Sequence, residues 1–179
     1  MLLFSRFHLS KKIALAFCLG LGLTALSACQ VRPLYSTNTT TGQTLSEALS
    51  TIEIEPAKNR VDQEIRNNLI FAFTGGGEAG IPAYKLLMKT RSSSTNLSIE
   101  SGTGLAKSRR VSLTTTYRLV RLSNNTIVTK GSSFFTATYA KSTQLFTNDR
   151  AEIDAENRAA AQVANDIELR LSAFLASGI

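Results

Sequence analysis

Histidine and cysteine, the residue types that most often perform nucleophilic or metal chemistry, are confined to the start of this 179-residue chain. The only histidine is His8, and the two cysteines are Cys18 and Cys29. From residue 30 onward neither type occurs, which excludes catalysis by imidazole or thiol, and metal sites built from them, in that part of the chain. What Cys29 does therefore depends on the N-terminal segment around it.

Paired carboxylates are the remaining option for acid–base catalysis. Glu53 and Glu55 are predicted to share one face of a strand, and Asp154 lies close in sequence to Glu152 and Glu156. Such pairs more often belong to a solvated face than to a catalytic site. No loop of the EF-hand kind accompanies them, so no metal site is predicted and we expect a protein that is not an enzyme.

Basic residues are the strongest chemical signal in the chain, which has 20 Lys and Arg against 13 Asp and Glu. Nine of them fall within residues 85–130, where Glu100 is the only acid. A surface of this charge favours an anionic ligand. A basic face that is merely solvated is the alternative. The candidate ligand-binding residues chosen on this charge argument are Arg91, Arg109, Arg110 and Lys130.

The first 28 residues have the pattern of a secretory signal peptide. Three basic residues and no acid precede an apolar stretch over residues 13–26, whose 14 residues are fewer than a membrane-spanning helix needs. Ser27 and Ala28, both small, lead from this stretch to Cys29. Because Cys18 would leave with the signal peptide, Cys29 has no disulfide partner in an exported protein.

Residues 26–29 (LSAC) resemble the lipobox of bacterial lipoproteins. The resemblance implies cleavage before Cys29, a diacylglyceryl group on its thiol, and an acyl chain such as palmitate on the new N-terminus. Two or three chains anchor a protein stably, at ~0.8 kcal/mol per buried methylene. In lipoproteins of Gram-negative bacteria, Asp directly after the acylated cysteine commonly retains the protein in the inner membrane. Gln30 occupies that position here, which favours the outer membrane. We therefore predict an acylated N-terminus and polar tether at residues 29–45 and a single domain at residues 46–179. The alternative is an ordinary signal peptide followed by a chance cysteine.

The first part of this domain is predicted to contain a short strand and a helix. Residues 50–56 alternate between apolar and acidic side chains, which indicates a half-buried strand. From Arg60 the apolar residues recur at four-residue steps, which indicates an amphipathic helix of about four turns with Asn59 as its N-cap. The glycines at residues 75–77 end this helix. No Lys-Ser/Thr follows them, so a phosphate-binding loop and its nucleotide cofactor are not expected.

Three strands and a long helix complete the predicted elements. Alternation over residues 83–100, 110–123 and 126–139 predicts an antiparallel meander, with Asn124 and Asn125 in a tight hairpin turn of positive φ. Residues 149–176 contain no Gly or Pro and carry an apolar stripe that includes Ile153. They predict a helix capped by Thr147 or Asn148.

The predicted element order is β-α-β-β-β-α, and the predicted fold class is α+β. Two amphipathic helices need one apolar surface, so we expect a four-stranded mixed sheet with both helices packed on one face. The helix after the first strand forms a crossover connection, which makes part of the sheet parallel.

Residues 29–35 (CQVRPLY) resemble the Cys-Gly-Phe-Arg-Pro-Leu-Tyr start of the LptE (RlpB) family of lipopolysaccharide-assembly lipoproteins, and depart from it at Gln30 and Val31. The resemblance extends over nearly all of residues 29–176, and its specificity rests on the order of short motifs. Those motifs are the strand around Ile52 and Ile54, the pattern Arg60-x-x-Gln63-x-x-Arg66-Asn67-x-Leu69, the strand Tyr84-x-Leu86, the basic turn before Val111, the strand Tyr117-x-Leu119 and the Ala-rich terminal helix.

The resemblance implies a non-enzymatic outer-membrane lipoprotein that sits as a plug in the β-barrel LptD. Such a protein assists folding of the barrel and helps deliver lipopolysaccharide to the outer leaflet, where the phosphates of lipid A would be the anion for the basic residues. Nucleic acid is not an expected partner in that compartment. Two alternatives stay open: a lipoprotein subunit of an ABC-type lipid or solvent transporter, and a lipid-anchored hydrolase that uses carboxylates.

Overall fold

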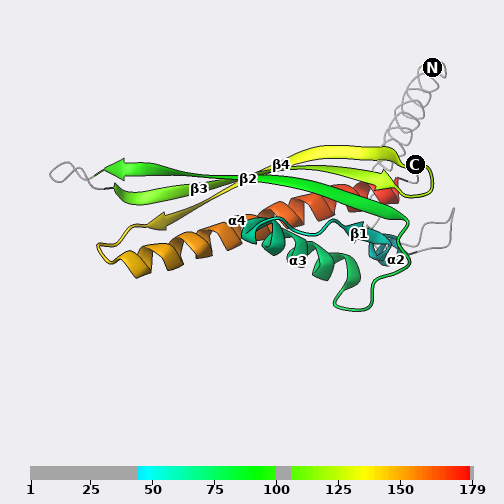
Figure 1. The fold of residues 1–179 in the computed structure, drawn as a ribbon, viewed down its shortest axis with the longest axis horizontal. Helices are drawn as coiled ribbons and strands as arrows, with labels where there is room; N and C mark the ends of the chain where they lie inside the picture. The colour runs from blue at the N-terminus through cyan, green and yellow to red at the C-terminus, as the bar shows by residue number, and fades with distance from the viewer. Residues whose placement is uncertain (1–43, 100–105, 178–179) are drawn as a thin grey trace, which may run out of the picture. The chain divides into compact units, whose positions relative to one another are not determined.

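The computed structural model describes residues 44–99 and 106–177. The chain divides into two units, Met1–Pro33 and Leu34–Ile179, and every described residue belongs to the second. The predicted signal peptide, Cys29 and most of the predicted tether lie outside the described residues. Within the second unit, four strands form one sheet and the helices cover one of its faces (Figure 1).

The order of elements confirms the predicted α+β fold and adds one helix at its start. The elements are α2 (Leu45–Ser50), β1 (Ile52–Ile54), α3 (Arg60–Thr74), β2 (Tyr84–Ile99), β3 (Ala106–Arg121), β4 (Thr126–Ala140) and α4 (Leu145–Ala176). The strands lie in the order β1-β2-β3-β4. The pair β1–β2 is parallel, because α3 crosses over between the two strands, whereas β2–β3 and β3–β4 are antiparallel. The sheet is therefore mixed, as predicted.

Helix α2 has no counterpart among the predicted elements. Its start is a capping box, in which Thr44 Oγ1 accepts from Glu47 N at 3.2 Å and Glu47 Oε2 accepts from Thr44 N at 2.9 Å. Leu45 and Leu49 lie one turn apart and are both buried in the core. Six residues are too few to produce a helical period, so the capping box was the one local signal for this helix.

Helix α3 begins and ends where the sequence predicts. The side chain of Asn59 accepts from Asp62 N at 2.8 Å, which satisfies a free N–H of the first turn. Gly75 ends the helix with a φ of 61°, in the left-handed region, and its N–H donates to Phe71 O at 2.8 Å. The residues predicted at four-residue steps, Val61, Ile65, Leu69 and Phe73, are buried, with Ile65 and Leu69 fully inaccessible, while Ala72 beside them is half-buried.

Helix α4 starts earlier than predicted, and the predicted cap at Thr147 or Asn148 is wrong. The helix begins at Leu145 after Gln144, whose side chain makes no capping hydrogen bond. Asn148 instead closes the preceding turn: its Oδ1 accepts from Ser142 N at 2.7 Å, and its Nδ2 donates to Ser142 O at 2.8 Å. Although α4 has 32 residues, no helix in the described part of the chain is long and apolar enough to cross a membrane.

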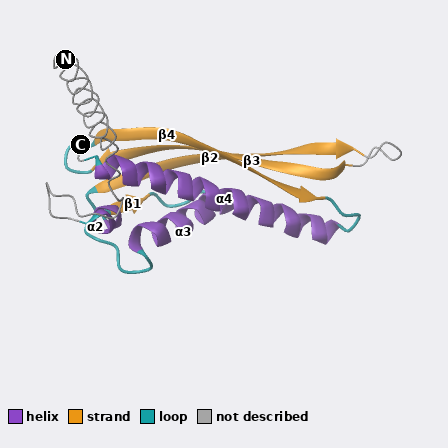
Figure 2. Ribbon diagram, turned by 180° about the vertical axis from the view of Figure 1, so that it is seen from behind, coloured by secondary structure: helices purple, strands orange, loops and turns teal. Residues whose placement is uncertain are grey.

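Alternation along β3 divides the sheet into two faces. Val111, Leu113 and Leu119 are fully buried beneath the helices, on what we call the helix face. The registers Met88↔Tyr117 and Tyr117↔Gly131 place the even-numbered residues of β2 and the odd-numbered residues of β4 on the same face. The opposite side of the sheet, which we call the open face, has no helix α2, α3 or α4 against it (Figure 2).

The hairpin between β3 and β4 turns at the predicted place, but its connection has four residues, 122–125, and is wider than predicted. Of the two asparagines, only Asn125 has a positive φ, of 53°, whereas a tight two-residue turn needs positive values at both central residues. Asn124 Oδ1 accepts from Thr126 Oγ1 at 2.7 Å and from Thr126 N at 3.3 Å. The turn brings β4 directly beside β3, so that a cation on one strand lies opposite a residue of the other.

Candidate functional site

The sheet separates the four predicted binding residues between its two faces. Arg91, Arg110 and Lys130 lie on the open face, because their strand partners are Thr114, Thr95 and Arg118, all on that side of the alternation. Arg109 points to the helix face, because successive side chains of a strand point to opposite faces and Arg110 lies on the open face. The structure therefore brings three of the predicted residues onto one surface and places the fourth elsewhere.

The three open-face residues belong to a larger set of cations. We define the basic face as the open-face residues Lys85, Lys89, Arg91, Arg110, Arg118 and Lys130. All but Lys85 are exposed. Within the part of the chain that the structure describes, none of the six forms an ion pair. Two described acids lie beside the basic face: Glu53, opposite Lys85 where β1 joins the sheet, and Glu55, near Lys89.

The basic face holds like charges close together. Arg118 and Lys130 are direct cross-strand partners, an arrangement that destabilises a sheet unless an anion lies between or above the two side chains. Both line an open groove of about 710 Å³, together with Lys89, Lys58 and Glu55. The groove is thus a place where a phosphate or carboxylate would relieve the repulsion of fixed cations.

An aromatic side chain lies beside these cations. Phe134 is 60% exposed and pairs with Thr114, which pairs in turn with Arg91, so that Arg91 and Phe134 flank one threonine on the open face. Leu87 lines the groove as well. An open face with both cations and apolar side chains fits a ligand that is itself anionic and apolar.

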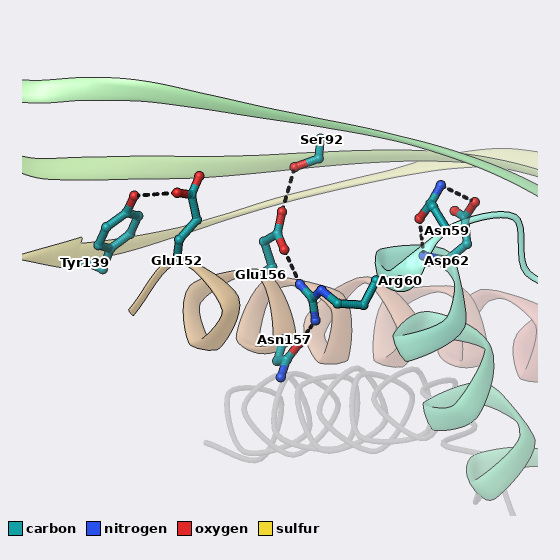
Figure 3. A network of polar contacts seen from close by, with 8 residues as sticks. All are labelled: Asn59, Arg60, Asp62, Ser92, Tyr139, Glu152, Glu156 and Asn157. Atoms are coloured by element: carbon teal, nitrogen blue, oxygen red, sulfur yellow. Dashed lines mark hydrogen bonds and ion pairs between the residues drawn. The ribbon is translucent and has the colours of Figure 1, made fainter. Parts of the chain in front are cut away.

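Arg109 is held by its own chain. Its Nη1 donates to the Tyr139 hydroxyl at 3.4 Å and lies 3.6 Å from Glu152 Oε2. The Tyr139 hydroxyl donates to the same carboxylate oxygen at 3.0 Å (Figure 3). The positive charge of Arg109 is therefore balanced inside the protein, between β3, β4 and α4.

The candidate catalytic carboxylates on α4 make structural contacts. Glu156 forms an ion pair with Arg60 of α3 and accepts from Ser92 Oγ of β2 at 3.4 Å (Figure 3). Asp154 pairs with Arg158 at 2.9 Å, one turn along the helix. Among the described residues there is no group of His, Cys, Asp and Glu side chains that could hold a metal ion.

Two tyrosines on the helix face have pKa values shifted from the usual value of 10. Burial raises the pKa of Tyr117, an effect that Arg170 opposes and Asp166 reinforces. Burial also raises the pKa of Tyr139, and the hydrogen bond to Glu152 adds to the rise. In Arg170 the hydrogen bond to Asp166 is the main cause that raises the pKa. These shifted groups lie away from the open face.

A second hollow, of about 340 Å³, lies between α2, α3 and α4. Its lining residues are Leu45, Ser46, Leu49, Ala72, Asn165, Glu168, Leu169 and Ser172. Because none of them is basic, this hollow does not suit the anion that the basic face would bind.

Lys85, Lys89 and Arg118 belong to the basic face but not to the set selected from the sequence. The signal that could have found them is strand parity. Arg118 alternates with Ser and Thr side chains at residues 112–116, and a strand whose other face is apolar must expose this set. Charge density alone, which selected Arg109, ignores parity.

Comparison with known proteins gives the chain its family. The profile of the family described as "LptE: Lipopolysaccharide-assembly" matches residues 49–171. Among curated protein sequences, none matches this chain significantly.

Solved structures share the fold. A candidate lipoprotein from Caulobacter crescentus CB15 is 26% identical and superposes with a TM-score of 0.63, over 75% of this chain and 97% of that one. The rare lipoprotein B from Shewanella oneidensis, 10% identical, gives a TM-score of 0.52 over 69% of this chain and 92% of its own. Lipoprotein B from Nitrosomonas europaea, 15% identical, gives a TM-score of 0.52 over 71% of this chain and 83% of its own. Because the family profile spans more than half of the sequence, the chain belongs to the LptE lipopolysaccharide-assembly family.

Proposed function

We propose that this chain is an outer-membrane lipoprotein that plugs the β-barrel LptD, assists its assembly and helps deliver lipopolysaccharide to the outer leaflet. In this proposal Cys29 carries the acyl chains, and the protein acts by binding rather than by catalysis. The observation that carries the proposal is the basic face, with six cations that make no ion pair among the described residues. Family membership supports it independently.

The dimensions of the domain agree with a plug. Helix α4, with 32 residues, is about 48 Å long at 1.5 Å per residue, longer than the ~30 Å hydrocarbon core of a membrane. The lumen of a large barrel is polar. The open face suits it, because the side chains between the cations are Ser and Thr, as at Ser93, Thr116 and Ser132.

The groove of the basic face supports lipopolysaccharide as the anionic ligand. Lys and Arg side chains bind phosphate through charge-assisted hydrogen bonds, and lipid A carries phosphates beside acyl chains. Arg91, Arg110 and Lys130 are the predicted residues that remain available for this contact. Phe134 offers an apolar surface beside them. Arg109 is instead assigned to the contact with α4.

A charge-reversal pair tests the ligand. The variant with Arg110→Glu and Lys130→Glu is expected to bind purified lipopolysaccharide at least about tenfold more weakly in low-salt buffer, because two attractive contacts become repulsive. The matched control is Lys141→Glu with Arg150→Glu, which changes the net charge equally at exposed residues outside the basic face. Equal binding by both variants would contradict the assignment of the ligand to this face.

Co-purification tests the partner. The full chain, produced with the LptD barrel of the same organism, is expected to form a stable complex, and depletion of the chain is expected to lower surface lipopolysaccharide. Recovery of the chain with an inner-membrane transporter, and no complex with the barrel, would contradict the proposed function.

A further inference from the structure

The outer edge of β2 is paired for only a short part of its length. Strand β1 pairs with β2 at Tyr84, Lys85 and Leu86, and Glu55 N then donates to Leu86 O at 3.0 Å. Past this point no described strand lies against that edge, although β2 continues to Ile99. Among the described residues, the edge that already accepts one strand is therefore unpaired over most of β2.

The direction of the main-chain groups on this edge follows from the pairing. In an antiparallel pair, alternate residues direct their N–H and C=O toward the partner or away from it. Leu86 O accepts from β1, so the even-numbered residues of β2 face outward. Lys89 O faces the other way and accepts from Thr116 Oγ1 of β3 at 3.4 Å. The residues that present N–H and C=O groups outward beyond the covered end are Thr90, Ser92, Ser94 and Asn96.

The side chains of this part of β2 are exposed, and Ser92, whose hydroxyl lies 3.4 Å from Glu156 of α4, contacts a helix on the helix face. All residues from 91 to 97 are exposed, and β2 runs on past the N-terminal end of α3 (Figures 1 and 2). Natural edges are commonly closed by Pro, by charge or by a bulge. Residues 92–96 have no Pro and no charge, and the first irregularity in pairing comes between Asn96 and Ser98.

The other edge of the sheet is more protected. By the same alternation, Thr138 directs its main-chain groups away from β3, and its carbonyl accepts from Arg158 Nη2 of α4 at 3.1 Å. Ser133 and Tyr139 are buried, so that one side of β4 is covered by the helix. Of the two edges, the β2 edge therefore has the more accessible main-chain groups for pairing with a further strand.

We propose that residues 90–96 of β2 pair with an extended segment of the barrel partner that carries acidic side chains toward the open face. The inference rests on the proposed function, because the partner is the proposed barrel. Main-chain hydrogen bonds would hold the segment, as in other cases of strand addition. Lys89 and Arg91 project on the open-face side of this edge, with Arg110 one strand further in, which selects an acidic segment. A second copy added antiparallel would place two basic faces side by side and is disfavoured.

A proline variant on the edge tests the pairing. Ser94→Pro removes an N–H that the sheet of this chain does not use, so the fold is expected to persist. In the complex, the proline could not donate a main-chain hydrogen bond to the added segment, and its ring would crowd that segment. The affinity for the barrel is therefore expected to fall about tenfold. The matched control is Ser132→Pro, which removes an outward N–H from the β4 edge and is expected to leave the affinity unchanged.

A second pair of variants keeps the backbone intact. Thr95→Glu places a negative charge beside the added segment and is expected to weaken the complex, whereas Thr95→Lys is expected to preserve or strengthen it. Hydrogen exchange of the complex is expected to slow over residues 90–97 and to stay the same over the β4 edge.

The outcomes separate this inference from the proposed function. If no complex with the barrel forms, both fall. If the complex forms but Ser94→Pro and Thr95→Glu bind as the parent chain does, only the pairing at β2 is overturned. Self-association of the free chain that Ser94→Pro abolishes would likewise overturn it, in favour of a second copy.

Discussion

Arg109 and Arg110 are neighbours on β3 with opposite surroundings. Arg110 projects from the open face and is exposed, whereas Arg109 reaches the Tyr139 hydroxyl and Glu152 on the helix face. A one-residue step along a strand therefore separates a side chain available to a ligand from one that attaches a helix.

This difference predicts unequal effects on stability. Arg109→Ala is expected to lower the free energy of unfolding by about 1 kcal/mol, because Glu152 and Tyr139 lose a partner in a half-buried site. Arg110→Ala is expected to change it by less than ~0.5 kcal/mol, as is usual for an exposed side chain. Urea unfolding of the two variants compares them directly, and equal losses would contradict the assigned roles.

Gly131 is a position where a side chain does not fit. A Cβ atom placed there would lie 2.5 Å from the Tyr117 hydroxyl oxygen, because the tyrosine ring lies over the glycine of the neighbouring strand. Gly131→Ala is therefore expected to destabilise the protein by about 1–3 kcal/mol.

A double variant tests the cause of that loss. With Tyr117→Leu already present, Gly131→Ala is expected to have a much smaller effect, because the ring that it would strike is gone. Thermal or urea unfolding of the four proteins of this cycle measures the coupling. Additive losses would mean that Gly131 is needed for a reason other than the ring.

At the scale of elements, local signals predict some boundaries and fail at others. Helix α3 has an N-cap, a regular apolar period and a glycine stop within its own sequence, so its limits were predictable. The start of α4 depends on contacts with a preceding turn, which sequence periodicity does not contain. Ile153, expected in the buried stripe, is 42% exposed, while Glu152 and Glu156 next to it make polar contacts with the sheet and α3.

The cap of α3 offers a test at this scale. Asn59→Ala is expected to lower the free energy of unfolding by about 1 kcal/mol, because Asp62 N loses its acceptor and Asp62 Oδ2 loses a donor 2.7 Å away. Asn59→Ser is expected to retain most of the stability, since Ser is also a good N-cap. Denaturant midpoints give the comparison, and a loss in the Ser variant as large as in the Ala variant would contradict capping as the cause.

At the scale of the whole molecule, the sequence predicts the charge of the candidate site but not all of its members. The density of Lys and Arg between residues 85 and 130 identifies the correct part of the chain. Which of them share a surface depends on strand register. The pairing of Arg118 with Lys130 and of Arg91 with Thr114 comes from two strand registers that no local pattern sets. That no described strand pairs with the outer edge of β2 beyond Leu86 is likewise a property of the assembled sheet.

The two buried tyrosines predict a loss of stability in alkali. Burial raises the pKa of Tyr117 and of Tyr139 above 10 in the folded state, so the folded protein holds these protons more tightly than the unfolded chain. The stabilising contribution is complete below pH 10 and is lost as the pH rises through the raised values. Urea unfolding at a series of alkaline pH values is expected to show this decline, and Tyr117→Phe is expected to make it shallower. An identical decline in that variant would exclude Tyr117 as a source.

Helix α4 follows all four strands in the sequence, and this order has a consequence for folding. The hairpins β2–β3 and β3–β4 join strands that follow each other in sequence and can form early, but the contact between Arg60 and Glu156 closes a separation of 96 residues. Until α4 docks, Val111, Leu113 and Leu119 have no cover from it, and an uncovered apolar sheet face is prone to aggregation. A chain that lacks α4 is therefore expected to expose the apolar helix face of its sheet, as a folding intermediate does, so that docking of α4 is the step that completes the native fold.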